Sequence, residues 1–176
     1  MNNKWIVLGV IGAVVLIIIM WAVGGYNGLV KSDEDLNKSW GNVESSYQRR
    51  ADLIPNLVST VKGYADFEKS TLVEVTNARA SATQVKVDPS DPTSFKKFEA
   101  AQNQASSSLS KLLVVVEKYP DLKANQSFID LQRELAGTEN RINVERRKYN
   151  DAVKTYNVNV RRFPRNILAS MFGFDQ

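Results

Sequence analysis

The chain has 176 residues, with 23 lysines and arginines against 19 aspartates and glutamates, and it contains neither cysteine nor histidine. The lack of cysteine excludes disulfides and thiolate chemistry, and the lack of histidine removes the commonest general base and transition-metal ligand. The net charge of +4 is mild and spread along the chain, so we expect no nucleic-acid partner. Nine glycines and five prolines allow few turns. We therefore expect long helices, no cofactor, no metal and no intrinsic catalysis.

Residues 5–23 form an apolar segment of 19 residues without a charge, which follows a short tail of residues 1–4. A helix of this length spans roughly 28 Å, close to the thickness of the hydrocarbon core of a bilayer. Trp5 and Trp21 lie near its two ends, where tryptophan prefers the lipid–water interface. The segment therefore predicts a single transmembrane anchor and an integral membrane protein.

A cleaved signal peptide is the alternative for this segment. Lys4 supplies a charged start, and the Ala-Val-Gly of residues 22–24 resembles a cleavage site. The apolar run is nevertheless longer than the ~7–15 residues typical of a signal sequence, which favours a retained anchor. Lys4 on one side nearly balances Lys31 and Lys38 on the other under the positive-inside rule. The short tail favours an N-terminus inside, with the following domain outside.

Residues 24–176 form the predicted helical domain, which begins at a Gly24-Gly25 hinge. An apolar stripe with a period near 3.5 residues then predicts one helix over about residues 26–86, with coiled-coil-like packing. Pro55 lies inside this stripe, and a proline either kinks or ends a helix. The apolar phase crosses Pro55 without a slip, which favours a kinked but continuous helix.

Two further helices and a short C-terminal segment complete the domain. The proline-containing sequence KVDPSDPT at residues 86–93 predicts a loop, a second stripe predicts a helix over about 93–119, and a third stripe predicts one over about 122–163. Residues 166–174 form a short amphipathic segment. The β-branched run at residues 112–116 keeps a helical period and is assigned to the second helix. The predicted fold is all-α: an N-terminal transmembrane helix followed by an elongated antiparallel three- to four-helix bundle.

The part of the first stripe nearest the anchor is a candidate self-association surface, composed of Leu29, Leu36, Trp40, Val43 and Tyr47. A helix over 26–86 would be roughly 90 Å long, against roughly 40 and 60 Å for the two that follow. These shorter helices would leave the stripe uncovered. Either the first helix bends back at Pro55 to give a compact four-helix bundle, or another subunit covers the stripe. The unbroken phase favours a homo-oligomer.

Two groups of charged residues are candidates for a special role. Arg49, Arg50 and Asp52 lie within one helical turn, and a solvated face is favoured over a docking point. The stretch around residues 138–146 is unusually polar for the middle of a bundle helix, which predicts a buried arginine–carboxylate network made of Glu117, Glu139, Arg141, Glu145 and Arg146. A di-metal site is disfavoured, because such bundle sites use a Glu-x-x-His motif. Four tyrosines are expected in the core with their hydroxyls at its edge: Tyr64, Tyr119, Tyr149 and Tyr156.

Several short motifs together resemble the LemA family. They include Tyr26-Asn27-x-Leu29-Val30, Arg49-Arg50-x-Asp52-Leu53-Ile54-Pro55-Asn56-Leu57, Glu117-x-Tyr119-Pro120, Leu135-Ala136-Gly137-Thr138-Glu139-Asn140-Arg141-Ile142 and Phe163-Pro164. Each motif alone is weak, but their combination covers essentially the whole chain after the anchor. The resemblance implies a bacterial membrane protein with a helical-bundle domain. It implies no settled biochemical activity.

The favoured function is a membrane-anchored scaffold or adaptor of the bacterial cytoplasmic membrane that self-associates or docks envelope proteins. The first alternative is lipid-surface binding or membrane remodelling through the basic residues 161–165 and the apolar side chains of Ile167, Leu168, Met171 and Phe172. Packing of this segment onto the end of the bundle is the favoured interpretation of its apolar face. A carboxylate-dependent enzyme is the last alternative, and it requires Glu117, Glu139 and Arg146 to converge in a deep pocket.

Overall fold

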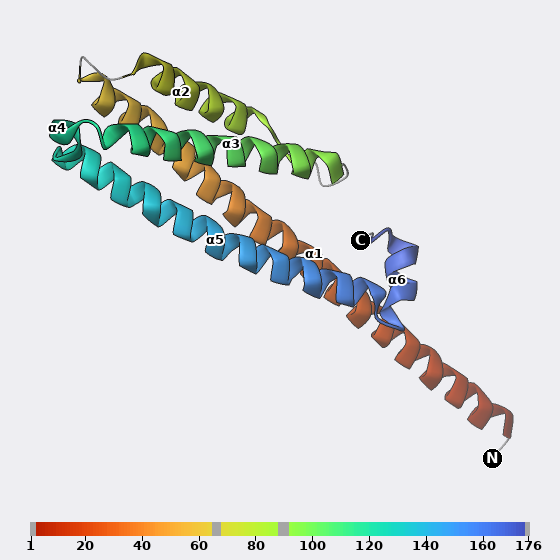
Figure 1. Ribbon diagram of the computed structural model, residues 1–176. Coiled ribbons are helices and arrows are strands. Elements are labelled where there is room, and N and C mark those ends of the chain that lie inside the picture. Colours follow the sequence, from red (N-terminus) through yellow and green to blue (C-terminus); the bar gives the residue numbers. More distant parts are fainter. Residues whose placement is uncertain (1–2, 65–67, 88–91, 175–176) are drawn as a thin grey trace. The chain divides into compact units, whose positions relative to one another are not determined.

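The computed structural model describes residues 3–64, 68–87 and 92–174, and every regular element within these ranges is a helix. The helices are α1 (Asn3–Lys62), α2 (Lys69–Gln84), α3 (Pro92–Val116), α4 (Pro120–Lys123), α5 (Gln126–Arg161) and α6 (Arg165–Phe172) (Figure 1). The all-α prediction is confirmed. The chain divides into a central unit, residues 43–144, and a terminal unit, residues 1–42 with 145–176. Helices α1 and α5 contribute to both units.

Helix α1 contains the apolar segment and continues from it without interruption. The predicted hinge at Gly24-Gly25 is therefore wrong: both glycines lie inside α1, and Gly25 is buried where the side chain of Leu168 approaches it. Pro55 also lies inside α1, so this proline does not end the helix. Pro55 removes one backbone hydrogen bond, and the helix nevertheless continues past it to Lys62.

The predicted single helix over residues 26–86 is wrong, because α1 ends at Lys62 and α2 begins at Lys69. Gly63 follows α1 and has a poor helix propensity, which an unbroken apolar phase does not reveal. The Tyr64 N–H donates to the Val61 carbonyl at 3.0 Å and closes a turn. The first stripe therefore belongs to two helices joined by a reversal.

The side chain of Tyr64 holds this end of the central unit together. It packs partly buried against the main core, its hydroxyl donates to the Asp121 carbonyl at 3.4 Å, and it accepts from the Asn125 amide at 3.2 Å. The Asn125 side-chain oxygen also accepts from the Phe128 N–H at 3.1 Å, as an N-cap does at the start of a helix. The position expected for the Tyr64 hydroxyl, at the edge of the core, is the one observed.

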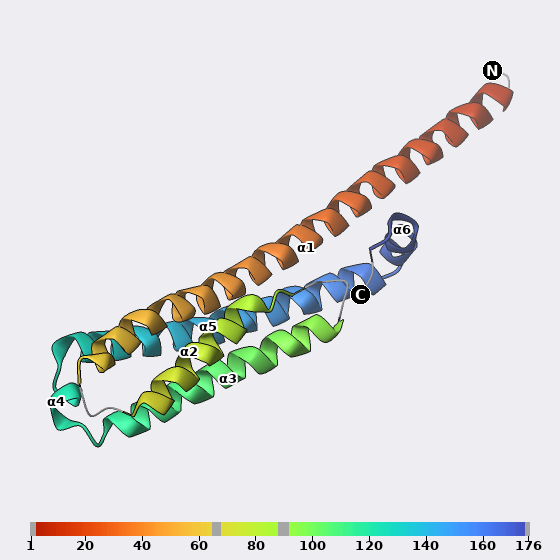
Figure 2. The same ribbon diagram turned by 90° about the horizontal axis from the view of Figure 1, so that it is seen from above.

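The central unit is a bundle of four helical segments, from α1, α2, α3 and α5, with α4 in the connection between α3 and α5 (Figures 1 and 2). Its core takes side chains from all of them. The members that are least exposed are Leu57, Val61, Val75, Leu112, Leu122 and Phe128. The β-branched run of residues 112–116 lies within α3, as its helical period predicted: Leu112 and Val116 are buried, whereas Val114 is exposed.

The terminal unit has a much smaller core. Its buried members are Leu29 from α1, Tyr156 and Val160 from α5, and Leu168 and Ala169 from α6. Helix α6 follows α5 after a sharp turn and ends at Gly173, whose φ of +73° suits glycine (Figure 1). The third predicted helix, residues 122–163, corresponds to α4 and α5 together, which are separated at Ala124-Asn125.

Candidate functional site

The central unit contains a buried arginine. The Arg50 side chain, from α1, is only 5% exposed, and its Nη1 donates to Oε2 of Glu139 on α5 at 2.8 Å. Its Nη2 donates to the Gln102 side-chain oxygen at 2.9 Å and to the Gln102 carbonyl at 3.1 Å, both on α3. The guanidinium carbon also lies 5.1 Å from the centroid of the Tyr47 ring. A guanidinium is well suited to this place, because its donors have a fixed, planar geometry.

Helix α2 joins the same polar cluster. The Gln102 side-chain amide donates to the Ala82 carbonyl at 3.2 Å, and Arg79 Nε donates to the Ala51 carbonyl at 2.8 Å. The four helices are thus connected by hydrogen bonds from Arg50, Arg79 and Gln102. Leaving any of these buried groups without a partner costs more than the bond itself contributes. We therefore expect this cluster to fix the register of the four helices.

The expected solvated face of Arg49, Arg50 and Asp52 is therefore wrong for Arg50. Arg49 does lie in solvent and pairs with Glu134 at 3.0 Å, and Asp52 accepts from Gln48 at 2.7 Å. The missed signal was Gln102, a polar residue at an apolar position of the second stripe. Its presence in the core requires a polar partner from a facing helix.

The three glutamates of the predicted polar network pair with three different cations. In the central unit, Glu139 pairs with Arg50, Glu117 pairs with Lys123 at 2.5 Å, and Arg141 is exposed. In the terminal unit, Glu145 pairs with Lys148 at 2.9 Å, and Arg146 is half-buried. The prediction of a shared network is wrong for these glutamates, because residues that are neighbours along one helix point to different faces of it. Glu117 and Glu139 thus do not supply the convergent site that the enzyme hypothesis requires, and no cluster suited to a metal ion occurs among the described residues.

The predicted self-association stripe is covered by the chain itself. In the terminal unit, Leu29 is fully buried, Leu36 packs against the same cluster, and the Trp40 ring lies 5.2 Å from that of Tyr149. In the central unit, Val43 is buried, and the Tyr47 ring lies 5.2 Å from that of Phe98 in an edge-to-face contact. Burial raises the pKa of Tyr149. The stripe was expected to be uncovered because the first helix was predicted to extend to about residue 86. Since α1 ends at Lys62, the helices that follow do reach the stripe.

The terminal unit exposes its apolar residues along the predicted span. One helix of the described residues is long and apolar enough to cross a membrane, and its most apolar window is 0% buried. Trp5 is 73% exposed and Trp21 39% exposed. Near the C-terminal end of the span, Ala22 packs against the cluster that contains Leu29. Ala22, the first residue of the suggested cleavage site, is thus part of the folded terminal unit.

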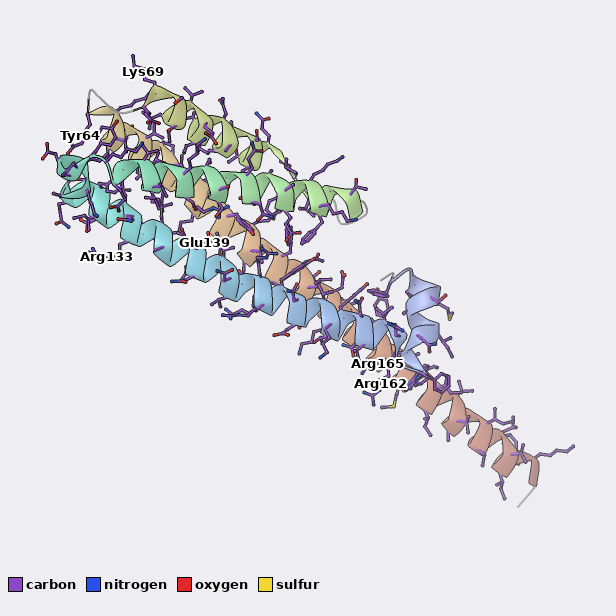
Figure 3. The ribbon with its side chains drawn as sticks, in the orientation of Figure 1. Tyr64, Lys69, Arg133, Glu139, Arg162 and Arg165 are labelled. Atoms are coloured by element: carbon purple, nitrogen blue, oxygen red, sulfur yellow. The ribbon has the colours of Figure 1, made fainter. Side chains whose placement is uncertain are left out.

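Helix α6 packs against α1 directly after the span. Leu168 and Ala169 are buried, whereas Ile167, Met171 and Phe172 on the same helix are exposed. Asn159 of α5 donates to the Ser32 hydroxyl at 2.6 Å and accepts from Arg165 at 3.3 Å, so that the start of α6 is tied to both long helices. Arg162 and Arg165 lie at this junction (Figure 3). The C-terminal segment thus packs on the unit, as favoured, but with only one of its faces.

The sequence model of the LemA family matches residues 39–176, which is most of the chain. The chain belongs to the LemA family. This LemA-family chain is a helical protein with an apolar helix suited to a membrane. The matched range includes Arg50, Gln102, Glu139 and α6, and it begins after the apolar segment.

Curated relatives of the LemA-family chain include proteins of two names. It is 26% identical over 147 residues to Protein LemA of Metamycoplasma hominis, a match that covers 84% of this chain and 64% of the relative. It is 28% identical over 168 residues to Magnetosome protein MamQ 2 of Paramagnetospirillum magneticum, which covers 85% of this chain and 62% of the relative. Magnetosome protein MamQ of Magnetospirillum gryphiswaldense is 26% identical with the same coverage. The chain thus spans less than two thirds of the length of these relatives.

Proposed function

We propose that this protein is a membrane-anchored scaffold or adaptor of the bacterial cytoplasmic membrane, with its N-terminus inside and its helical domain outside. The observation that carries the proposal is the continuity of α1, which runs from the apolar span into the central unit without a break. Arg50 lies on this same helix and is hydrogen-bonded to α3 and α5. A partner bound to the central unit would therefore be held by a helix that is itself anchored.

The docking surface that the central unit offers is a shallow hollow of about 520 Å³ at the end of α1 and along α2. Leu72 and Val73 supply apolar surface, and Val73 is 57% exposed. Lys62 and Lys69 border it with positive charge, and Figure 3 shows Lys69 on the same end of the unit as Tyr64. This combination suits a protein partner that inserts an apolar side chain flanked by acidic residues. Self-association through the covered stripe is not part of the proposal.

Photo-crosslinking in native membranes tests this proposal. A photoreactive amino acid at Val73 of the full chain is expected to give a discrete product with one protein, and the same group at exposed Gln132 of α5 is expected not to. Reversing the charge of both Lys62 and Lys69 to glutamate should reduce the yield at Val73. A product with the mass of two chains would identify a second copy as the partner. Equal yields at both positions, or none at Val73, would contradict docking at this hollow.

A further inference from the structure

Helix α6 contacts α1 just beyond the end of the apolar segment of residues 5–23. A Cβ built on Gly25 would lie 2.6 Å from Cδ1 of Leu168, so the two helices are in close contact there. Tyr26 stacks edge-on against Phe172 at 4.9 Å and Phe174 at 6.0 Å between ring centroids. Gly25 lies four residues beyond Trp21, which corresponds to roughly 6 Å along a helix. The headgroup layer on each side of a hydrocarbon core is also roughly 5–7 Å thick.

Several apolar side chains on α6 and just before it stay exposed, including the part of Phe172 that Tyr26 does not cover. Ile167 is 50% exposed, Met171 72% and Phe172 56%, and Phe163 just before the helix is 75% exposed. All four lie within ten residues of one another, on a segment fixed to α1 by Leu168 and Ala169. Such a contiguous apolar surface in water is unfavourable, and it marks a site of protein or membrane contact. This surface belongs to a helix that contacts α1 at Gly25, two residues beyond the predicted span.

Positive charge accompanies this apolar surface. Arg161 and Arg162 precede α6 and are exposed, and Arg165 begins the helix. From Asp151 to Asp175 the sequence contains no other acidic residue, but it contains Lys154 and these three arginines. Arginine binds phosphate groups well, because its planar donors match their oxygens. Basic residues next to an apolar helical face are typical of helices that lie in the interface of an anionic membrane.

We infer that α6 lies in the headgroup layer of the leaflet from which α1 emerges, with Phe163, Ile167 and Met171 in contact with acyl chains and with Arg161 and Arg162 bound to the phosphates of anionic lipids. The inference does not depend on the proposed adaptor function. Arg165 serves a different purpose, because its side chain lies against Gly28 and hydrogen-bonds to Asn159. The terminal unit would then be attached to the membrane at two points, which limits rotation of α1 about its own axis.

Depth measurement by spin labelling tests this inference on the full chain. The chain has no cysteine, so a single Met171→Cys substitution carries one label. Matched labels at Ile17 in the span and at Gln132 in the central unit provide the lipid and water references. The protein is reconstituted into vesicles of phosphatidylcholine with and without phosphatidylglycerol. The ratio of collision rates with oxygen and with a water-soluble nickel complex is expected to be several-fold higher at residue 171 than at residue 132, and higher with the anionic lipid than without it.

Charge variants separate the two parts of the inference. Arg161→Gln with Arg162→Gln should abolish the dependence of the residue-171 ratio on anionic lipid, and high salt should weaken it. Arg141→Gln with Arg147→Gln removes the same charge from exposed positions elsewhere and should leave the ratio unchanged. A ratio at residue 171 equal to that at residue 132 would overturn the inference. Low collision rates with both reagents would also overturn it, because they would indicate a protein partner or a second copy. A ratio that changes neither with lipid charge nor with the substitution of Arg161 and Arg162 would overturn it as well.

Discussion

The central and terminal units use the same two long helices but bury their apolar residues differently. In the central unit, segments of four helices enclose a large core that includes Leu57, Leu112 and Phe128, and the buried Arg50 hydrogen-bonds to α3 and α5. In the terminal unit, a cluster of five buried residues holds α1, α5 and α6 together, and apolar residues of α1 and α6 stay exposed. The central unit encloses most of its apolar side chains by itself, whereas the terminal unit leaves apolar side chains of α1 and α6 exposed, which agrees with the proposed contact with lipid.

Matched leucine truncations test this contrast most strongly. Leu57 and Leu29 are both fully buried, in the central and the terminal core respectively. Leu57→Ala is expected to lower the free energy of unfolding by about 4 kcal/mol, because it leaves a cavity among four helices. Leu29→Ala should cost less and should act mainly by releasing α6. Denaturant unfolding in detergent and hydrogen exchange of residues 165–172 measure the two effects, and a larger global loss for Leu29→Ala would break the contrast.

Removal of the central arginine is expected to have the next largest effect. Arg50→Ala leaves the oxygens of Gln102 without their donor and opens space beside Tyr47, which should cost about 3 kcal/mol. Arg49→Ala, one residue earlier, removes an arginine that is 58% exposed, and it should cost about 0–1 kcal/mol. Thermal unfolding of the two variants in the same detergent gives the comparison. Similar losses for both would show that Arg50 does not fix the bundle.

Substitutions at two neighbouring glycines test where α6 contacts α1 in the terminal unit. Gly25→Leu should displace Leu168 and weaken the packing of α6, which we expect to cost about 1–3 kcal/mol as overpacking does. Gly24→Leu adds the same side chain where no atom lies within 4 Å, and it should leave α6 in place. Faster hydrogen exchange of residues 165–172 in the first variant alone is the expected result. Equal hydrogen-exchange rates of residues 165–172 in the two variants would show that Gly25 is not the point where α6 contacts α1.

The smallest effect is expected for the surface pair of Arg49 and Glu134. Both side chains are about half exposed and lie 3.0 Å apart. A double-mutant cycle with alanine at each position should give a coupling energy of about 0–1 kcal/mol, which falls with added salt. A coupling energy as large as the effect of Arg50→Ala would mean that surface charge, rather than the buried cluster, sets the register of the central unit.

The sequence predicted most of the helical segments, but it did not predict which side chains from different helices contact one another. The uncharged run of residues 5–23 and the apolar period of residues 93–116 are strong local patterns, and both lie in helices. The reversal after Lys62 was missed because Gly63 is its only strong signal and the apolar phase continues across it. The burial of Arg50 depends on Gln102, which is 52 residues away along the chain. No local pattern reports such a pair, although a glutamine at a core position shows that some partner is needed.

The central claim is that α1 carries an uncut membrane span into the helical domain. The most direct test is alkaline extraction of native membranes, followed by intact-mass measurement of the protein that stays in the membrane pellet. The account predicts that the protein resists extraction and that its mass includes residues 5–23. Release of the protein into the soluble fraction, with a mass that lacks the residues before about 25, would show that the segment is a cleaved signal peptide and would contradict the account.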